Sequence, residues 1–240
     1  MKIGRPLVNG CCLAALCAQW PSHAQQLPAG AIDYMPLLKQ NVAALWPEAK
    51  PRSPFAAQIE QETCISLKSK GCWNPKTELK TQREYGFGLG QLTVAYNADG
   101  SERFNGYTEM VKYRELQDWR WEDRYNPDYQ LKALVLKDRN VYQGVKFPVA
   151  DDFERLAFMF ASYNGGLGGL LKDHKLCEST TGCNSRFWFN RDGENGVEST
   201  SYKSKTAAPG YKKSFFEISR EYPKNIMYVR RAKYVSAMDD

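Results

Sequence analysis

Residues 151–166, with the sequence DDFERLAFMFASYNGG, constrain the fold more than any other stretch of the chain. Asp151 and Asp152 are residues that commonly start helices, and the five positions from 156 to 160 are all apolar. A helix that is apolar on nearly every side is stable only when other elements cover it. We therefore expect this segment to be the buried central helix of the domain.

Other stretches also carry helix signals, whereas strand signals are scarce. Three stretches have apolar residues at intervals of three and four, and each follows residues that commonly start helices. These starting residues are Asp33, Ser53-Pro54 and Asn126-Pro127. A further helix, bent at Pro223, is expected over residues 211–234. At most one small β-hairpin is expected, around residues 85–97. The sequence thus predicts a mainly α fold.

The first 24 residues are typical of a secretory signal peptide. Lys2 and Arg5 precede a short apolar run, and the small residues Ser22 and Ala24 predict cleavage after Ala24. The run is too short for a stable membrane span. We therefore expect an exported protein, periplasmic or secreted, whose formal charge of +6 falls to +4 once the two basic residues are removed. The competing interpretation keeps this segment as an apolar helix packed on the domain.

Four of the seven cysteines form two local pairs, Cys64 with Cys72 and Cys177 with Cys183. Such pairs are typical of small disulfide loops made in an oxidising compartment. Reduced thiols and a zinc site are the alternatives, but the spacings differ from those of zinc knuckles. We predict two disulfides, no metal and no organic cofactor. His174 lies between lysines and is expected at the surface, where it supports no nucleophile system.

The positive charge of the chain suits an acidic polymer, such as a bacterial wall or anionic lipid. It does not predict a nucleic-acid partner, because no run of five or six basic residues occurs. No internal repeat divides the chain. We expect an N-terminal helix and linker at 25–52, a core at 53–175, and a disulfide loop, polar stretch and C-terminal helix at 176–240 that pack on the core.

Glu62 ends the helix that Ser53 begins, and it is the first candidate for chemistry. A glutamate at the carboxyl end of a helix, near apolar walls, has its acid form favoured. Such a carboxyl can donate a proton to a glycosidic oxygen. Two further features follow it along the chain, the glycine segment GFGLGQL at 86–92 and the end of the central helix, ASYNGG, at 161–166.

These three segments resemble, in order, the three motifs of the soluble lytic transglycosylase domain of the lysozyme-like superfamily. The family pattern is I-x-x-E-[ST], then G-L-x-Q-[LIM], then A-x-Y-N-G-G. The chain has IEQET at 59–63, GLGQL at 88–92 and ASYNGG at 161–166. The resemblance covers roughly residues 50–172. It implies an α+β lysozyme-like fold, mainly helical, with a catalytic cleft and a small β-hairpin.

The resemblance also implies a role for each matching residue. Glu62 would be the catalytic acid, with Tyr163 beside it. The substrate-binding residues would be Thr63, Gly88, Leu89, Gln91 and Asn164. The family cleaves the bond between N-acetylmuramic acid and N-acetylglucosamine in peptidoglycan glycan strands, leaving 1,6-anhydromuramyl ends without consuming water. A monomer that binds these strands is expected.

Glu84 raises an alternative within the same superfamily. The stretch EYGFGLGQLTVAYN is similar to the plant-type chitinase segment YGRGPIQLT-x-x-x-NY, and those enzymes use a second glutamate. A hydrolytic muramidase or chitinase-like endolysin, with Glu62 and Glu84 as its carboxylates, is therefore the main rival. The YNGG sequence fits the transglycosylases better, and Glu84 is then a solvated loop acid.

A third hypothesis is a non-catalytic glycan-binding protein on the same scaffold. The presence of Glu62, Gln91 and Tyr163 together argues against it. Each residue also has a purely structural interpretation: Tyr163 as a core aromatic, Gln91 as a partner of loop backbone and Asn164 as the cap of its helix. The stretch LQDWRWEDRYNPDYQ contains four aromatic residues, Trp119, Trp121, Tyr125 and Tyr129. They could stack on sugar rings or pack inside the protein, and their helix-like spacing favours packing.

Overall fold

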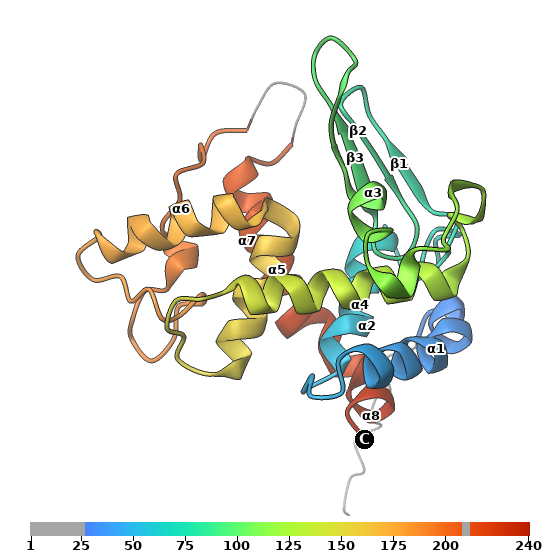
Figure 1. The fold of residues 1–240 in the computed structure, drawn as a ribbon. Helices are drawn as coiled ribbons and strands as arrows, with labels where there is room; N and C mark the ends of the chain where they lie inside the picture. Colours follow the sequence, from blue (N-terminus) through green and yellow to red (C-terminus); the bar gives the residue numbers. More distant parts are fainter. Residues whose placement is uncertain (1–26, 208–211) are drawn as a thin grey trace, which may run out of the picture.

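Helix α5 (Asp152–Gly165) lies at the centre of the helical part of the molecule, as its apolar sequence predicts (Figure 1). The computed structural model describes residues 27–207 and 212–240, so the predicted signal peptide lies outside the described residues. Helix α5 packs against α4 (Pro127–Gly144), α6 (Leu167–Glu178) and α7 (Phe215–Lys224). Its residues 156–162 are all buried.

Three of the four predicted helix starts, at Ser53, Asn126 and Asp151, are confirmed, and the one at Asp33 is wrong. The side chains of Asn126 and Asp151 each accept a backbone N–H from the first turn of their helices at 2.9 Å. Helix α1 (Ala29–Leu45), by contrast, begins before Asp33. The carbonyl of Pro28 accepts the backbone N–H of Ala31 at 3.0 Å, so the first turn forms upstream of Asp33.

Helix α2 (Ser53–Thr63) is a second buried helix, and its residues 53–60 are all shielded from solvent. It packs against the segment that follows α7. That segment continues through the π-helical η4 (Asn225–Arg230), the 3₁₀ turn η5 (Arg231–Tyr234) and α8 (Val235–Met238). Pro223 lies in the last turn of α7, just before the helical hydrogen-bonding pattern changes at η4.

A four-stranded antiparallel sheet projects from the helices (Figure 1). The predicted hairpin is formed by β2 (Glu84–Phe87) and β3 (Leu92–Tyr96), and β1 (Glu78–Lys80) and β4 (Glu102–Asn105) extend it on either side. Short helices follow at α3 (Gly106–Met110), η1 (Arg114–Leu116), η2 (Trp121–Asp123) and, beyond α6, η3 (Val197–Ser199). One face of the sheet packs on a small apolar core through Phe87 and Leu92.

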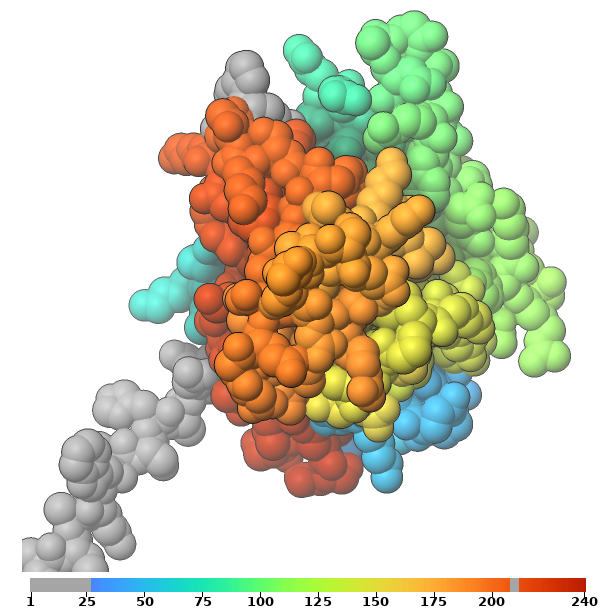
Figure 2. Space-filling model, turned by 90° about the vertical axis from the view of Figure 1, so that its left-hand side faces the viewer, coloured from blue at the N-terminus to red at the C-terminus, as the bar shows by residue number. Residues whose placement is uncertain are grey.

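Both predicted disulfides are confirmed, Cys64–Cys72 and Cys177–Cys183. The expectation that His174 lies at the surface is wrong. The residue is buried, with its ring centroid 3.8 Å from that of Phe147. Viewed from the side of α6 and α7, the orange and red chain from α6 onward covers the near face, with the green sheet behind it (Figure 2). The described residues thus form a mainly α fold with a small sheet, which confirms the predicted fold class.

Within residues 27–207 and 212–240, no helix combines the length and the apolar character that crossing a bilayer requires.

Asp239 caps helix α2 from a distant part of the chain. Its Oδ1 accepts the backbone N–H groups of Arg52 and Ser53 at 2.7 and 2.6 Å, and its Oδ2 accepts the Ser53 hydroxyl at 2.7 Å. We predict that Asp239→Ala lowers the free energy of unfolding by about 1 kcal/mol, since capping acids contribute that much. Denaturant titration measures it, and exposed Asp240→Ala is the matched control. Equal stability of the two variants would contradict the capping role.

Candidate active site

A pocket of about 550 Å³ lies between the carboxyl end of α2 and one face of the sheet. On the helix side it is lined by residues 61–64 and by the loop that the first disulfide closes. On the sheet side, Leu79, Gly86 and Thr93 are direct cross-strand neighbours, so they share the face that lines the pocket. The carboxyl end of α2 therefore faces the sheet surface on which Gly86 lies between Leu79 and Thr93.

Glu62 lies in the last turn of α2 and lines this pocket. Its side chain is partly open to the pocket, yet the surrounding protein removes most of its water, and this burial raises the pKa of Glu62 to about 7. The Tyr222 hydroxyl donates a hydrogen bond to Glu62 Oε1, and both this bond and the charge of Lys137 act to lower the pKa. Near neutral pH the carboxyl is close to half protonated, so it can both give and take a proton.

Two tyrosines and a lysine surround the glutamate. The rings of Tyr163 and Tyr222 are parallel, with centroids 6.4 Å apart. The Tyr163 hydroxyl donates to the carbonyl of Gly90 at 2.6 Å, and Lys137 Nζ lies 3.6 Å from the centre of the Tyr163 ring. Tyr163 therefore joins the helix α5 motif to the glycine segment, while Tyr222 makes the direct bond to Glu62.

A second carboxyl, Asp138, lies behind the glutamate on α4. Gln58, one turn before Glu62 on α2, donates from Nε2 to Asp138 Oδ1 at 3.2 Å. Asp138 is fully buried, and its Oδ2 has no hydrogen-bond partner within the described part of the chain. Burial raises the pKa of Asp138 to about 8, so it is predominantly neutral at pH 7.

The glycines bring the sheet segment close to the helices. Gly88 has φ +77°, and a Cβ there would lie 2.5 Å from the side chain of Gln130, whose Oε1 accepts the N–H of Leu89 at 2.9 Å. At Gly90 a Cβ would lie 3.1 Å from the Tyr163 hydroxyl. Bare backbone at these two positions therefore admits side chains of α4 and α5.

The residues expected to bind substrate have two different environments. Thr63 and Gln91 line the pocket, and both also bond backbone: the Thr63 hydroxyl donates to Ile59 O at 2.6 Å, and Gln91 Nε2 donates to Gly88 O at 2.8 Å. The other three are not among the described residues that line the pocket: Gly88 and Leu89 are buried, and Asn164 is exposed at the end of α5.

Glu84 lies exposed at the start of β2 and lines the same pocket as Glu62. The structure therefore brings the two predicted carboxylates to opposite walls of one space, one at the end of a helix and the other on a strand. Glu84 is the carboxylate that a two-carboxylate mechanism would use.

Sequence reasoning missed Tyr222, Lys137 and Asp138. The sequence did mark Lys137 and Asp138, because this charged pair directly follows the apolar run ALVL within a predicted helix. Tyr222 lies 160 residues from Glu62, in a helix whose sequence marks no site. Its role became visible only from the packing of α7.

Comparisons with known proteins leave the site to be judged on its geometry. No protein-family model matches the chain, and no curated protein matches it significantly. In residues 27–207 and 212–240, no three His, Cys, Asp or Glu side chains are grouped so as to hold a metal ion.

The hydrogen bond from Tyr222 sets a measurable proton affinity. We predict that Tyr222→Phe raises the pKa of Glu62 above its value of about 7, because the bond that favours the carboxylate is lost while the ring packing is kept. A ¹³C NMR titration of the labelled carboxyl measures this. Tyr228→Phe, at an exposed position of η4, is the matched control. An unchanged or lower pKa in Tyr222→Phe would refute the assignment.

The raised pKa of Glu62 also predicts a pH-dependent cost to stability. The folded state holds the Glu62 proton more tightly than the unfolded chain does. The stabilisation of the folded state by this proton is therefore complete below pH 4.5 and is lost as pH rises through about 7. Glu62→Gln has no such proton to lose. We expect it to gain about 3 kcal/mol relative to the parent protein between pH 4 and pH 8. Urea unfolding at both pH values measures this, and parallel pH dependences would contradict it.

Proposed function

We propose that this protein cleaves the glycan strands of peptidoglycan as a lytic transglycosylase, with Glu62 as general acid and then general base. The observation that carries the proposal is the state of Glu62, which opens to a pocket and has its pKa raised by burial to about 7. Support comes from the three motif segments, since Glu62, Gln91 and Tyr163 converge on the pocket or its wall.

The reaction needs one carboxyl. Glu62 in its acid form gives its proton to the oxygen that bridges the two sugars, and the bond from that oxygen to the muramyl C1 breaks. The C6 hydroxyl oxygen of the same muramyl residue then attacks C1, and its proton passes to the Glu62 carboxylate. The products are a 1,6-anhydromuramyl end and a free sugar hydroxyl. The enzyme regains its acid form and no water is consumed.

The neighbours of Glu62 suit both halves of this cycle. Burial favours the acid form that starts the reaction. The Tyr222 hydroxyl and the Lys137 charge stabilise the carboxylate that exists after proton donation. Asp138 lies behind them without adding a second negative charge near pH 7.

Glu84 favours hydrolysis as a second candidate, because it lines the same pocket. In that reaction it activates or positions a water molecule that attacks C1 from across the pocket, and a reducing end results. A glycan-binding protein without activity is the third candidate, and it requires the pocket to bind strands without cleaving them.

The two disulfides support export to an oxidising compartment, either the periplasm or the medium. Glycan strands are the proposed partner there, and the protein acts on them as a monomer.

Digestion of purified peptidoglycan followed by mass spectrometry tests the proposal. The parent protein should release anhydromuramyl ends, Glu62→Gln should lose at least about 100-fold in rate, and Glu84→Gln should keep most of the activity. Circular dichroism of each variant controls for folding.

Three outcomes would contradict the proposal. Reducing ends, together with a loss in Glu84→Gln as large as that in Glu62→Gln, would establish the hydrolase. Full activity of Glu62→Gln would exclude this catalytic residue. Binding of strands without release of fragments would leave only the non-catalytic candidate.

A further inference from the structure

A second pocket, of about 450 Å³, lies on the other face of the sheet. Side chains alternate between faces along a strand, so Lys80 and Tyr85 point away from the face that Leu79 and Gly86 present to Glu62. Tyr96 of β3 shares the Tyr85 face, and all three line this pocket. Its volume falls in the range of about 300–1,000 Å³ that small-ligand sites occupy.

The aromatic cluster beside the sheet divides into buried and exposed members. Trp119 is only 2% exposed and stacks on Tyr129 at 5.8 Å, which is internal packing. Trp121, two residues later, is 37% exposed and lines the pocket. Tyr107 and Phe87 meet its ring edge-on at 5.1 and 5.4 Å, so the exposed indole is firmly held.

Polar groups are fixed around this indole. The hydroxyls of Tyr85 and Tyr125 both donate to Glu78 Oε1, and these bonds, that of Tyr125 first, lower the pKa of Glu78. The Arg124 guanidinium lies 4.3 Å from the Tyr125 ring centre and 4.9 Å from that of Trp121. The pocket therefore presents an aromatic surface, a carboxylate, a guanidinium and two phenols.

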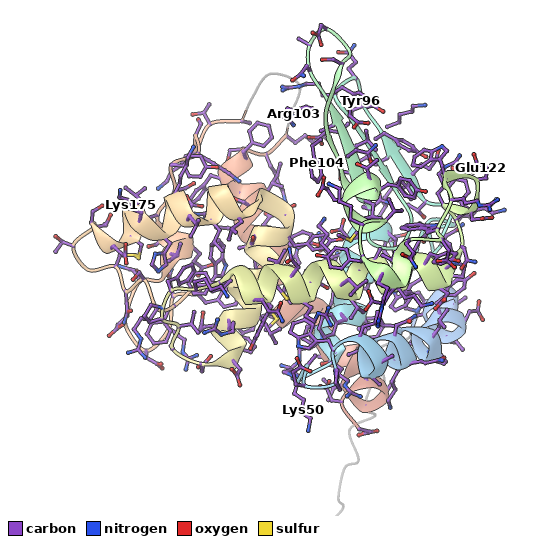
Figure 3. The ribbon with its side chains drawn as sticks, viewed as in Figure 1. Lys50, Tyr96, Arg103, Phe104, Glu122 and Lys175 are labelled. Carbon is purple, nitrogen blue, oxygen red and sulfur yellow. A yellow bond between two sulfur atoms is a disulfide. The ribbon has the colours of Figure 1, made fainter. Side chains whose placement is uncertain are left out.

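Figure 3 places the site in the molecule. Tyr96 on the sheet and Glu122, next to Trp121, lie on the sheet side, far from Lys175 of α6. Glu78 borders both this pocket and the one that holds Glu62, and the sheet lies between the two pockets.

We propose that this pocket binds a pyranose ring of a glycan chain, as a second sugar-binding site distinct from the Glu62 pocket. The apolar face of a sugar ring covers the indole, while its hydroxyl and acetamido groups bond the carboxylate and guanidinium. The choice of a wall glycan as the source of that ring rests on the proposed function.

The charges of the pocket argue for this ligand over others. A nucleic-acid strand would bring its phosphates to Lys80 and Arg124 but also against the Glu78 carboxylate that lines the same pocket. An organic cation would be repelled by Arg124, 4.9 Å from the Trp121 ring centre, and by Lys80, 5.6 Å from that of Tyr85. A neutral sugar with several hydroxyls matches the donors and acceptors without either conflict.

NMR titration of the Glu62→Gln protein with tetra-N-acetylchitotetraose tests the proposal. The indole N–H signal of Trp121 should shift on addition of sugar, and Tyr125→Ala should weaken the affinity read from that signal about tenfold. Arg124→Gln provides a second variant that leaves the aromatic packing in place. Tyr202→Ala, at an exposed tyrosine beyond α6, is the matched control and should bind as the parent does.

An unmoved Trp121 signal at millimolar sugar would overturn the proposal, as would equal affinities in all variants. Tighter binding of an oligothymidylate at the same signal would replace the sugar by single-stranded nucleic acid. The outcomes for this site and for the proposed cleavage can be told apart. A shifted Trp121 signal with no release of wall fragments supports the sugar site and refutes the cleavage. Release of fragments with an unmoved Trp121 signal supports the cleavage and refutes the sugar site.

Discussion

The buried charge of Glu60 is the interaction on which the arrangement of the site depends. Its carboxylate accepts hydrogen bonds from Lys233 Nζ at 2.8 Å and from the Tyr234 hydroxyl, and the Arg230 guanidinium is 3.6 Å away. Removing one partner of such a buried pair typically costs about 3–5 kcal/mol. Positions two apart on a helix point roughly 200° from each other. Holding Glu60 against the C-terminal segment therefore directs Glu62 to the opposite side, toward the pocket.

The same packing sets the chemistry of Glu62. The segment that binds Glu60 continues from α7, and α7 brings the Tyr222 hydroxyl to Glu62. Burial on this scale would drive the carboxyl to its neutral form, but one phenol and one ammonium oppose it, and the balance is a pKa of about 7. Helix α2 thus has one carboxylate, Glu60, paired with Lys233 and Arg230, and another, Glu62, two residues later, whose pKa lies near neutral pH.

Local signals predicted the elements but not their meeting points. Asn126 and Asp151 start their helices because each side chain can bond the first turn, a property of a few neighbouring residues. Gly90 lets the helix that carries Tyr163 approach, because a Cβ there would lie 3.1 Å from the Tyr163 hydroxyl. The partners of Glu62 could not be named, since nothing near Tyr222 or Lys137 specifies which helix it will face. Trp119 and Trp121 show the same limit: two tryptophans of one WRW triplet differ in burial because a 3₁₀ turn begins between them.

Because Asp239 caps helix α2, this helix is completed only late in the synthesis of the chain. Asp239 bonds Arg52 and Ser53, which lie 187 and 186 positions earlier in the chain. Tyr222 bonds Glu62, which lies 160 positions earlier. A ribosome therefore releases helix α2 long before it has made Asp239, which caps this helix, and Tyr222, which bonds its glutamate. The nascent chain therefore contains Glu62, the glycine segment and helix α5 before it contains Tyr222 and Asp239. Glu62 has the surroundings that bring its pKa to about 7 only after the segment from α7 onward has been made.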